Sequence, residues 1–309
     1  MTSPGTPTFD QLRLFLAVVD SGSFAGAGRQ LGRAVSVISY GIAKLEAQLG
    51  LLLFEREGTR RPRLTEAGRA VLVEARGVSQ GVDDLRAKVK GLLDGVEAEV
   101  NLAVDVMLPA HRLGQVLRAF AVRYPTVTMR LHVEALGAVM ALVLDGHAVV
   151  GISGPLSAGV QGIDSVAAGS VAMVPVAAPD HPLARMARIT PGAGRKHVQL
   201  VLTDRSPLTE GRDFGVSSPR TWRLADLGAK HQLLREGIGW GNMPLPLIEA
   251  DLVAGTLTRL AMPERQGGIY GFAGIWRQDT PPGPAASWML AKFVELGQLD
   301  VEEPGMADA

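Results

Sequence analysis

The fold is decided by residues 9–50, which read FDQLRLFLAVVDSGSFAGAGRQLGRAVSVISYGIAKLEAQLG. Apolar residues recur in three segments of this stretch at the 3.6-residue period of a helix, and glycines separate the segments. Gly22 and Gly32 are suited to end the first two helices because glycine tolerates the left-handed turn, and Ser23 is placed to cap the second helix. A short turn between two small helices is one way to place a helix in the major groove of DNA, so the stretch predicts a helix-turn-helix.

The third helix of this stretch is expected to have two different sides. The apolar side carries Ile38, Ile42, Leu45 and Leu49. The opposite side is small, polar and basic, which permits a close approach to the phosphates and base edges of DNA. The candidate DNA-binding residues of this region are Ser23, Arg33, Ser36, Ser39, Tyr40 and Lys44. The same spacing also fits a small helical core with an ordinary solvated face.

A basic turn follows the third helix. Its glycine and proline, Gly58 and Pro62, suit a two-stranded wing. Arginines beside a recognition helix favour contacts to phosphates. The candidates for such contacts are Arg56, Arg60, Arg61 and Arg63. Away from a helix-turn-helix, the same segment would be interpreted as a solvated loop.

A long helix is expected from Thr65, which is placed to cap it, to about Leu92. Apolar residues follow a heptad pattern in two interleaved series, which is typical of a dimerising seam. The members of the two series are Val71, Ala75, Val78, Val82, Leu85, Val89 and Leu92. Gly77 and Gly81 weaken the pattern, and a helix that packs on its own domain is the alternative.

Many of these residues form short motifs in a fixed order, and together the motifs resemble the winged helix-turn-helix of LysR-type transcriptional regulators. The matching motifs and residues are Leu14-Phe15-Leu16-Ala17-Val18, Ser21-Gly22-Ser23-Phe24, Ala27, Leu31, Ser39, Ile42, Leu45-Glu46, Leu49-Gly50, Leu53-Phe54-Glu55-Arg56 and Leu64-Thr65-Glu66-Ala67-Gly68. The rest of the chain resembles that family more loosely, to about residue 300. The resemblance implies a dimeric or tetrameric transcription factor whose C-terminal domain binds a small co-inducer.

The chain departs from the family pattern on the third helix. The family usually has Gln where this chain has Val35, and Arg or Lys followed by Gln where it has Tyr40-Gly41. We interpret these positions as groove-facing, so two bidentate donors for purine edges are missing. Ser36, Ser39 and Tyr40 are the expected replacements.

The C-terminal two-thirds predict α/β architecture. Alternating strands near residues 100–106, 127–133 and 149–152, with helices between them, indicate a parallel sheet. A second α/β unit starts near residue 165, and residues 269–296 are expected to return to the first. Two lobes joined by two crossings resemble a periplasmic-binding-protein-like effector domain, a fold that the LysR family shares. The expected domains are 1–64, the linker helix 65–92 and the effector domain 93–309, with lobe I at about 97–164 and 265–300 and lobe II at about 165–264.

Ligands of open α/β sheets sit beyond the carboxyl ends of the strands. Four segments are expected at these ends, residues 105–108, 153–155, 203–206 and 240–243. Their hydroxyls and backbone amides can hold a small anion. Arg205 can pair a carboxylate, although each residue also has an ordinary role as a turn cap or surface group. The candidate effector-binding residues are Asp105, Met107, Ser153, Thr203, Arg205, Trp240 and Asn242.

Composition restricts the alternatives. Residues 1–92 hold 13 Lys and Arg against 9 Asp and Glu, and residues 93–309 hold 18 against 22, so the excess charge is modest. The absence of cysteine excludes disulfides and thiolate sites, and the six histidines lack metal-ligand spacing, so no metal or cofactor is expected. The N-terminal residues do not resemble a signal peptide, and no apolar run is long enough to span a membrane, which together favour the cytoplasm.

The sequence therefore predicts a transcriptional regulator that binds double-stranded DNA, responds to a small molecule and forms a homo-oligomer, a dimer or tetramer. RNA polymerase is an expected partner if the protein is an activator. The departures on the third helix leave an alternative, a small-molecule-binding module with a degenerate DNA-binding head that acts through protein partners. An α/β enzyme with a fused helical arm would need a catalytic pair, and the sequence offers no Gly-x-Ser-x-Gly elbow and no phosphate-binding loop.

Overall fold

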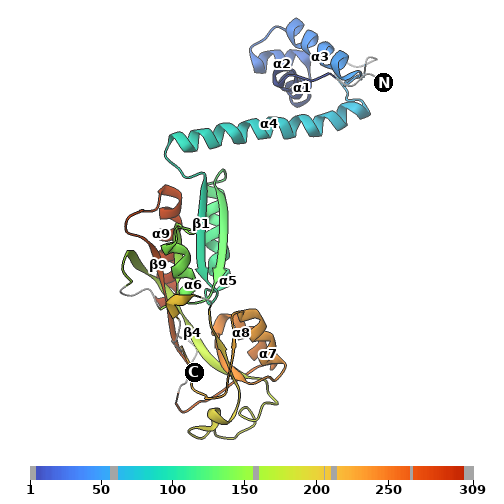
Figure 1. Ribbon diagram of the computed structural model, residues 1–309. Coiled ribbons are helices and arrows are strands. Elements are labelled where there is room, and N and C mark those ends of the chain that lie inside the picture. Colours follow the sequence, from blue (N-terminus) through green and yellow to red (C-terminus); the bar gives the residue numbers. More distant parts are fainter. Residues whose placement is uncertain are drawn as a thin grey trace. The chain divides into compact units, whose positions relative to one another are not determined.

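The computed structural model describes residues 5–55, 62–155, 160–204, 206–209, 214–264 and 267–302, the last four of them by their backbone alone. The chain divides into two compact units, residues 1–90 and 91–309 (Figure 1).

The first unit is helical. Helices α1 (Phe9–Ser21), α2 (Phe24–Leu31) and α3 (Val35–Leu49) enclose a core in which Phe15, Ile38 and Leu45 are fully buried. The glycines predicted to end α1 and α2 do so in the left-handed conformation, with φ of 67° at Gly22 and 63° at Gly32. An antiparallel bridge between Phe54 and Leu64 follows, and then the long helix α4 (Glu66–Leu93).

The second unit is built on one nine-stranded mixed sheet, with strand order β2-β1-β3-β9-β4-β7-β5-β6 and with β8 paired to β4. Strand β1 is parallel to β2 and β3, which gives the first lobe, and β5 is parallel to β6 and β7, which gives the second. The strands are β1 (Glu99–Asp105), β2 (Thr128–Glu134), β3 (Val150–Ser153), β4 (Ile163–Ala177), β5 (Gln199–Leu202), β6 (Thr221–Leu224), β7 (Trp240–Pro244), β8 (Thr258–Arg259) and β9 (Gly268–Arg277).

Two antiparallel strands, β4 and β9, run through both lobes and join them (Figure 1). Strand β9 pairs with β3 of the first lobe, whereas the second half of β4 pairs with β7 of the second lobe. The register between β4 and β9 shifts between Ala167 and Ser170, where Gly169 has a φ of 87°. This bulge marks the passage from one lobe to the other.

Helices flank this sheet, and most of them follow the sequence prediction. They are α5 (Ala110–Arg123), α6 (Gly137–Leu144), α7 (Leu227–Arg235), α8 (Leu245–Ala254) and α9 (Pro284–Glu302), with short 3-10 turns η1 (Ala193–Lys196) and η2 (Pro207–Thr209). Helix α7 begins at Leu227 because Asp226 caps it, and Leu224 ends strand β6. Helix α8 was not predicted, since its apolar residues follow no clear helical stripe.

None of the helices in the described part of the chain is both long and apolar enough to cross a membrane.

Candidate nucleic-acid interface and inter-lobe cavity

The turn between α2 and α3 is fixed by contacts within the head. Ser23 caps α2, since its hydroxyl accepts from the backbone N–H of Gly26 at 3.0 Å. Arg33 forms a two-pronged ion pair with Asp10 of α1, with N–O distances of 2.6 and 2.9 Å. This pair lowers the pKa of Asp10 through the hydrogen bond from Arg33. Ser23 and Arg33, both candidates for DNA contact, therefore already have structural partners in the head.

The outer face of α3 is solvent-exposed, whereas its inner face forms part of the core. Ile38, Ile42 and Leu45 are buried. Tyr40 is the most exposed large hydrophobic side chain of the helix, at 71%. The exposed residues of this face that were predicted to contact DNA are Ser36, Ser39, Tyr40 and Lys44. The structure brings them together on one helix face, as their spacing predicts.

Two further features of α3 bear on its interpretation as a DNA-reading helix. Gly41 is buried and lies against Leu14 of α1, where a Cβ atom would collide with the Leu14 side chain. Its interpretation as a groove-facing position was therefore wrong, and glycine at this position permits close packing of two helices. Val35 and Val37 are each 46% exposed, so the outer face presents two branched apolar side chains beside its polar ones.

The base of the wing is positioned by a carboxylate of α3. Glu46 accepts the backbone N–H groups of Leu53 and Phe54 at 2.7 and 3.2 Å. The backbone N–H of Glu55 donates to the carbonyl of Arg63, whose side chain is exposed. Arg56, Arg60 and Arg61 lie outside the described residues.

Helix α4 divides into two parts. Thr65 caps it, since its hydroxyl accepts from Gly68 N–H at 2.8 Å. Val71 and Ala75 pack against the helical core of their own head, so the alternative of packing on the helix's own domain applies to these two members of the predicted seam. Farther along the helix, the seam is exposed or half-buried, at Val78, Val82, Leu85, Val89 and Leu92.

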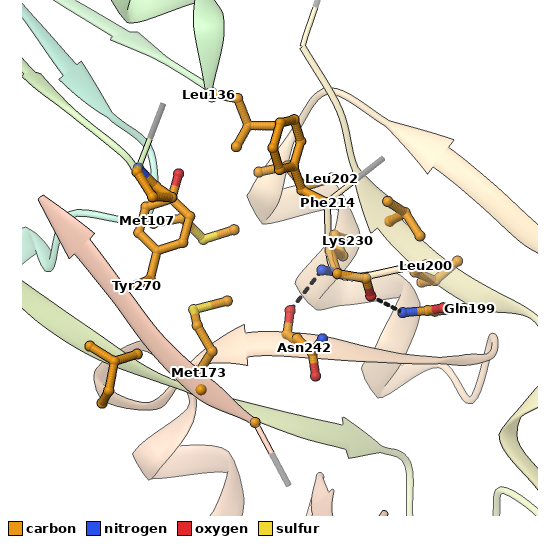
Figure 2. Close-up of a pocket in the computed structure, with 16 residues that line it drawn as sticks. Met107, Leu136, Met173, Gln199, Leu200, Leu202, Phe214, Lys230, Asn242 and Tyr270 are labelled. Atoms are coloured by element: carbon orange, nitrogen blue, oxygen red, sulfur yellow. Dashed lines mark hydrogen bonds between the residues drawn. The ribbon is translucent and has the colours of Figure 1, made fainter. Parts of the chain in front are cut away.

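A cavity of about 250 Å³ lies between the two lobes of the second unit (Figure 2). The first lobe contributes Met107, Leu136 and Pro155 to its wall. The crossing strands contribute Met173 and residues 267–270. The second lobe contributes Gln199, Leu200, Val201, Leu202, Phe214, Gly215, Lys230 and Asn242. Most of this wall is apolar, as expected for a small-molecule site with a few polar groups that fix orientation.

One buried carboxylate organises the first-lobe side of the cavity. Asp105 is 1% exposed and accepts the N–H of Met107 at 2.8 Å, the N–H of Leu136 at 3.2 Å and the Tyr270 hydroxyl at 2.8 Å. Burial raises the pKa of Asp105 to about 6, although these donors oppose the rise. Leu136 has a φ of 50°, which L residues rarely adopt, so Asp105 holds a strained residue in the cavity wall.

Two residues of the second-lobe wall, Lys230 and Asn242, have polar groups that are incompletely hydrogen-bonded in the described structure. Lys230 of α7 is 3% exposed, and its Nζ donates to the backbone oxygen of Asn242 at 2.7 Å (Figure 2). Burial lowers the pKa of Lys230 to about 8. The side-chain Oδ1 of Asn242 is buried without a hydrogen-bond partner in the described structure. Sequence reasoning missed Lys230 because a lysine within an amphipathic helix is ordinarily solvated.

Some of the predicted effector-binding residues line the cavity, and others do not. Met107 and Asn242 line the cavity, and Asp105 supports it from behind. Ser153 is fully buried, and its Oγ has no hydrogen-bond partner among the described residues. The hydroxyl of Thr203 donates to the carbonyl of Asp204, and neither residue is among those that line the cavity. Arg205 lies outside the described residues.

Trp240 does not lie in the cavity. It is buried in a separate apolar cluster with Leu183 and Leu260, and its Nε1 donates to the carbonyl of Gly194 at 3.2 Å. Trp240 is not among the residues that line the cavity because it begins strand β7, whereas ligands gather beyond the carboxyl end of a strand.

Comparison with protein families agrees with this arrangement. The helix-turn-helix model of the LysR family, described as a bacterial regulatory helix-turn-helix protein, matches residues 9–69. The model described as the LysR substrate binding domain matches residues 93–298. The chain belongs to the LysR family. This LysR-family protein is a DNA-binding transcriptional regulator with an effector-binding domain.

Individual relatives cover nearly the whole LysR-family chain. The probable HTH-type transcriptional regulator YhaJ of Escherichia coli K12 is 29% identical over 295 residues, which are 94% of this chain and 96% of YhaJ. Full-length LysG of Corynebacterium glutamicum with bound effector Arg has a TM-score of 0.52 at 21% identity, covering 94% of this chain and 98% of LysG. The OxyR C206 mutant of C. glutamicum has a TM-score of 0.51 at 19% identity, covering 96% and 93%. The two solved structures share the fold.

Proposed function

We propose that this LysR-family regulator places the outer face of α3 in the major groove of double-stranded DNA, and that a small molecule in the inter-lobe cavity sets its activity. The observation that carries the first part is the two-sided α3, with Ile38 and Ile42 in the core and Tyr40 exposed on the opposite face. Ser36 and Ser39 on that face are small enough to allow close approach to base edges. Lys44 and Arg63 are exposed and basic, so they are suited to phosphate contacts.

Control by a small molecule requires that the ligand favour one arrangement of the two lobes. The cavity is suited to this role because both lobes and both crossing strands contribute to its wall. A ligand that contacts Met107 on one side and Asn242 on the other would stabilise one spacing between them. LysG, which shares the fold, was solved with arginine as its effector.

We further propose that α4 joins two copies of the chain. Val78, Leu85, Val89 and Leu92 are exposed on α4, and a second copy would remove this stripe from water. In functional terms, residues 1–64 would bind DNA, 65–92 would assemble the oligomer and 93–309 would bind the effector. In this proposal the protein acts in the cytoplasm, without catalysis, and meets RNA polymerase if it is an activator.

Fluorescence anisotropy on the purified full chain tests DNA binding. The probes are a duplex from the region upstream of its own gene and a scrambled duplex, each titrated with salt. We expect tighter, salt-dependent binding to the native duplex. Tyr40→Ala should reduce the preference for the native duplex more than it reduces overall affinity. Tyr40→Phe should show whether the hydroxyl or the ring of Tyr40 carries this preference. Arg29→Ala, at an exposed position on α2, is the control. Equal loss of preference and affinity in Tyr40→Ala would indicate a merely structural tyrosine.

The exposed Val35 and Val37 favour a second candidate, a head that no longer reads DNA and acts through a protein partner. The same titration separates the two functions. No binding to either duplex at low salt, by a protein that still binds a small molecule, would support the degenerate head.

A further inference from the structure

In the wall of the inter-lobe cavity, the positive charge of Lys230 has no counter-ion among the residues that the structure describes. Lys230 is nearly completely buried, and its Nζ makes one hydrogen bond, to the backbone oxygen of Asn242. Among the described residues no carboxylate lies close enough to affect its titration, since desolvation is the single cause of its lowered pKa. A buried ammonium group ordinarily has an anionic partner, because removing it from water is costly.

The local backbone is adapted to this lysine. Gly241 lies on β7 beside the end of the Lys230 side chain, and a Cβ atom there would approach Lys230 Cε to 3.1 Å and the carbonyl of Leu200 still more closely. Glycine therefore leaves room for the lysine stem to pass over the strand and reach Asn242. The charge is held at this point of the cavity by the packing, rather than extending to solvent as surface lysines do.

A second unsatisfied group lies next to it. The Oδ1 of Asn242 is buried and accepts no hydrogen bond in the described structure. Gln199, the other amide in the wall, is satisfied: it donates to Gly215 and accepts from Ser217 and Ser218. Among the described residues, Lys230 Nζ therefore lacks an anionic partner, and Asn242 Oδ1 lacks a hydrogen-bond donor.

The remaining wall limits the size and polarity of a ligand. Met107, Leu136, Met173 and Phe214 surround the polar pair with apolar surface. A cavity of about 150 Å³ holds one benzene ring, so 250 Å³ suits a substituted single ring or a branched chain of similar size. One cation matches one negative charge, which favours a carboxylate over a doubly charged phosphate.

We infer that the cavity selects a compact monocarboxylic acid, with the carboxylate on Lys230 Nζ, a hydroxyl or amine donating to Asn242 Oδ1, and an apolar body against Met107, Met173 and Phe214. This inference rests on the proposed effector function of the cavity and assigns its chemical class. Lys230 is the residue that distinguishes an acid from its uncharged analogue.

The test is isothermal titration calorimetry on the full chain at pH 7 with matched acids and amides. The probes are benzoate and 2-hydroxybenzoate, each paired with its uncharged primary amide, at up to 10 mM. We expect at least one acid to bind at least tenfold more tightly than its amide, and 2-hydroxybenzoate to bind more tightly than benzoate. Lys230→Met should abolish the acid preference, whereas Lys292→Met, on α9 of the same unit, should retain it.

The inference is overturned if no acid binds, if acid and amide bind equally, or if Lys230→Met keeps the preference. The first two outcomes are read on the native protein, so they hold even if Lys230→Met does not fold. DNA binding by the same preparation separates the two proposals. A protein that binds its duplex and prefers the amides contradicts the acid class alone, whereas failure to bind the duplex contradicts the proposed DNA-binding function.

Discussion

The hydroxyl of Tyr270 donates a 2.8 Å hydrogen bond to the carboxylate of Asp105, and thereby links crossing strand β9 to the carboxyl end of β1. The same carboxylate accepts the N–H groups of Met107 and Leu136. Tyr270, Met107 and Leu136 all line the inter-lobe cavity. One buried group that is itself hidden from the cavity therefore holds three separate parts of its wall in place.

This arrangement predicts a pH dependence of stability. The pKa of Asp105 is about 6 in the folded protein because of burial, against an ordinary value near 3.8. Between these values the folded state binds more protons than the unfolded state, so the free energy of unfolding falls as pH rises. We expect Asp105 to contribute a loss of about 2 kcal/mol between pH 4 and pH 7, at about 1.4 kcal/mol per unit of pKa.

The measurement is urea unfolding of the native protein and Asp105→Asn from pH 4 to pH 7. Asparagine cannot ionise, and its amide N–H₂ would lie against groups that donate to Asp105, the N–H groups of Met107 and Leu136 and the Tyr270 hydroxyl. Because two donors cannot pair, the variant should be less stable than the native protein at pH 4. The difference between the two should shrink as pH rises and Asp105 ionises. A difference that is constant over this range would show that Asp105 does not titrate there.

Arg112 predicts a second effect on stability. It is buried on α5, and its guanidinium donates to the carbonyls of Ala168, within the bulge in β4, and Ser170, at its end, at 3.3 and 3.2 Å. Arg112→Met keeps the apolar stem but leaves these buried carbonyls without their donor. We expect a loss of roughly 2–4 kcal/mol in urea unfolding.

The control for Arg112 is Arg118→Met, an exposed arginine on the same helix, which should change stability by less than about 0.5 kcal/mol. Equal effects of the two substitutions would mean that the bulge is held by the rest of the β4–β9 pairing rather than by Arg112.

The exposed valines of α3 predict how this head reads DNA. Val35 and Val37 cannot replace the bidentate donors that the family uses, but a branched apolar side chain suits the methyl group of thymine. Replacing thymine by uracil in the bound duplex removes those methyl groups. We expect anisotropy to show an affinity loss of about threefold to tenfold, at about 0.8 kcal/mol per buried methyl.

The double variant Val35→Ala, Val37→Ala should bind thymine and uracil duplexes with nearly equal affinity. A native protein that does not distinguish the two duplexes would show that the valines lie outside the groove.

Helix α4 predicts the oligomeric state. Leu85 is 61% exposed and lies beyond Val71 and Ala75, which the head already buries. Leu85→Glu should place a charge in the proposed seam and shift the mass measured by light scattering toward the monomer, whereas Lys88→Glu, also exposed on α4, should leave the mass unchanged. An unchanged mass for Leu85→Glu would place the interface elsewhere.

Local signals in the sequence predicted the head well, and tertiary contacts explain what they missed. Gly22, Gly32, Ser23 and Thr65 act on groups within a few residues, so helix ends follow from the sequence itself. The role of Gly41 depends on Leu14, which is distant in sequence, and no local pattern indicates that contact.

The cavity shows the same division between local and distant contacts. Asn242, which lines the cavity, was a candidate because of the rule for the carboxyl ends of strands. Lys230 was not, because its burial depends on Gly241 of the neighbouring strand and on the carbonyl of Asn242. The bulge near Gly169 also escaped prediction, since it is visible only once β4 pairs with β9.

Lys230 predicts a pH dependence of ligand binding opposite in origin to that of Asp105. Burial lowers its pKa to about 8 in the ligand-free protein, and an acid binds the protonated form. A bound carboxylate favours that form, so binding above pH 8 must take up a proton.

We expect the affinity for 2-hydroxybenzoate to be level between pH 6.5 and pH 7.5 and to fall toward tenfold per pH unit above pH 8. The affinity for benzamide, which has no group that ionises in this range, should not change with pH in this way, and titrations in buffers of different ionisation enthalpy should show proton uptake with the acid alone. An acid affinity that stays level to pH 9.5 would place the carboxylate away from Lys230.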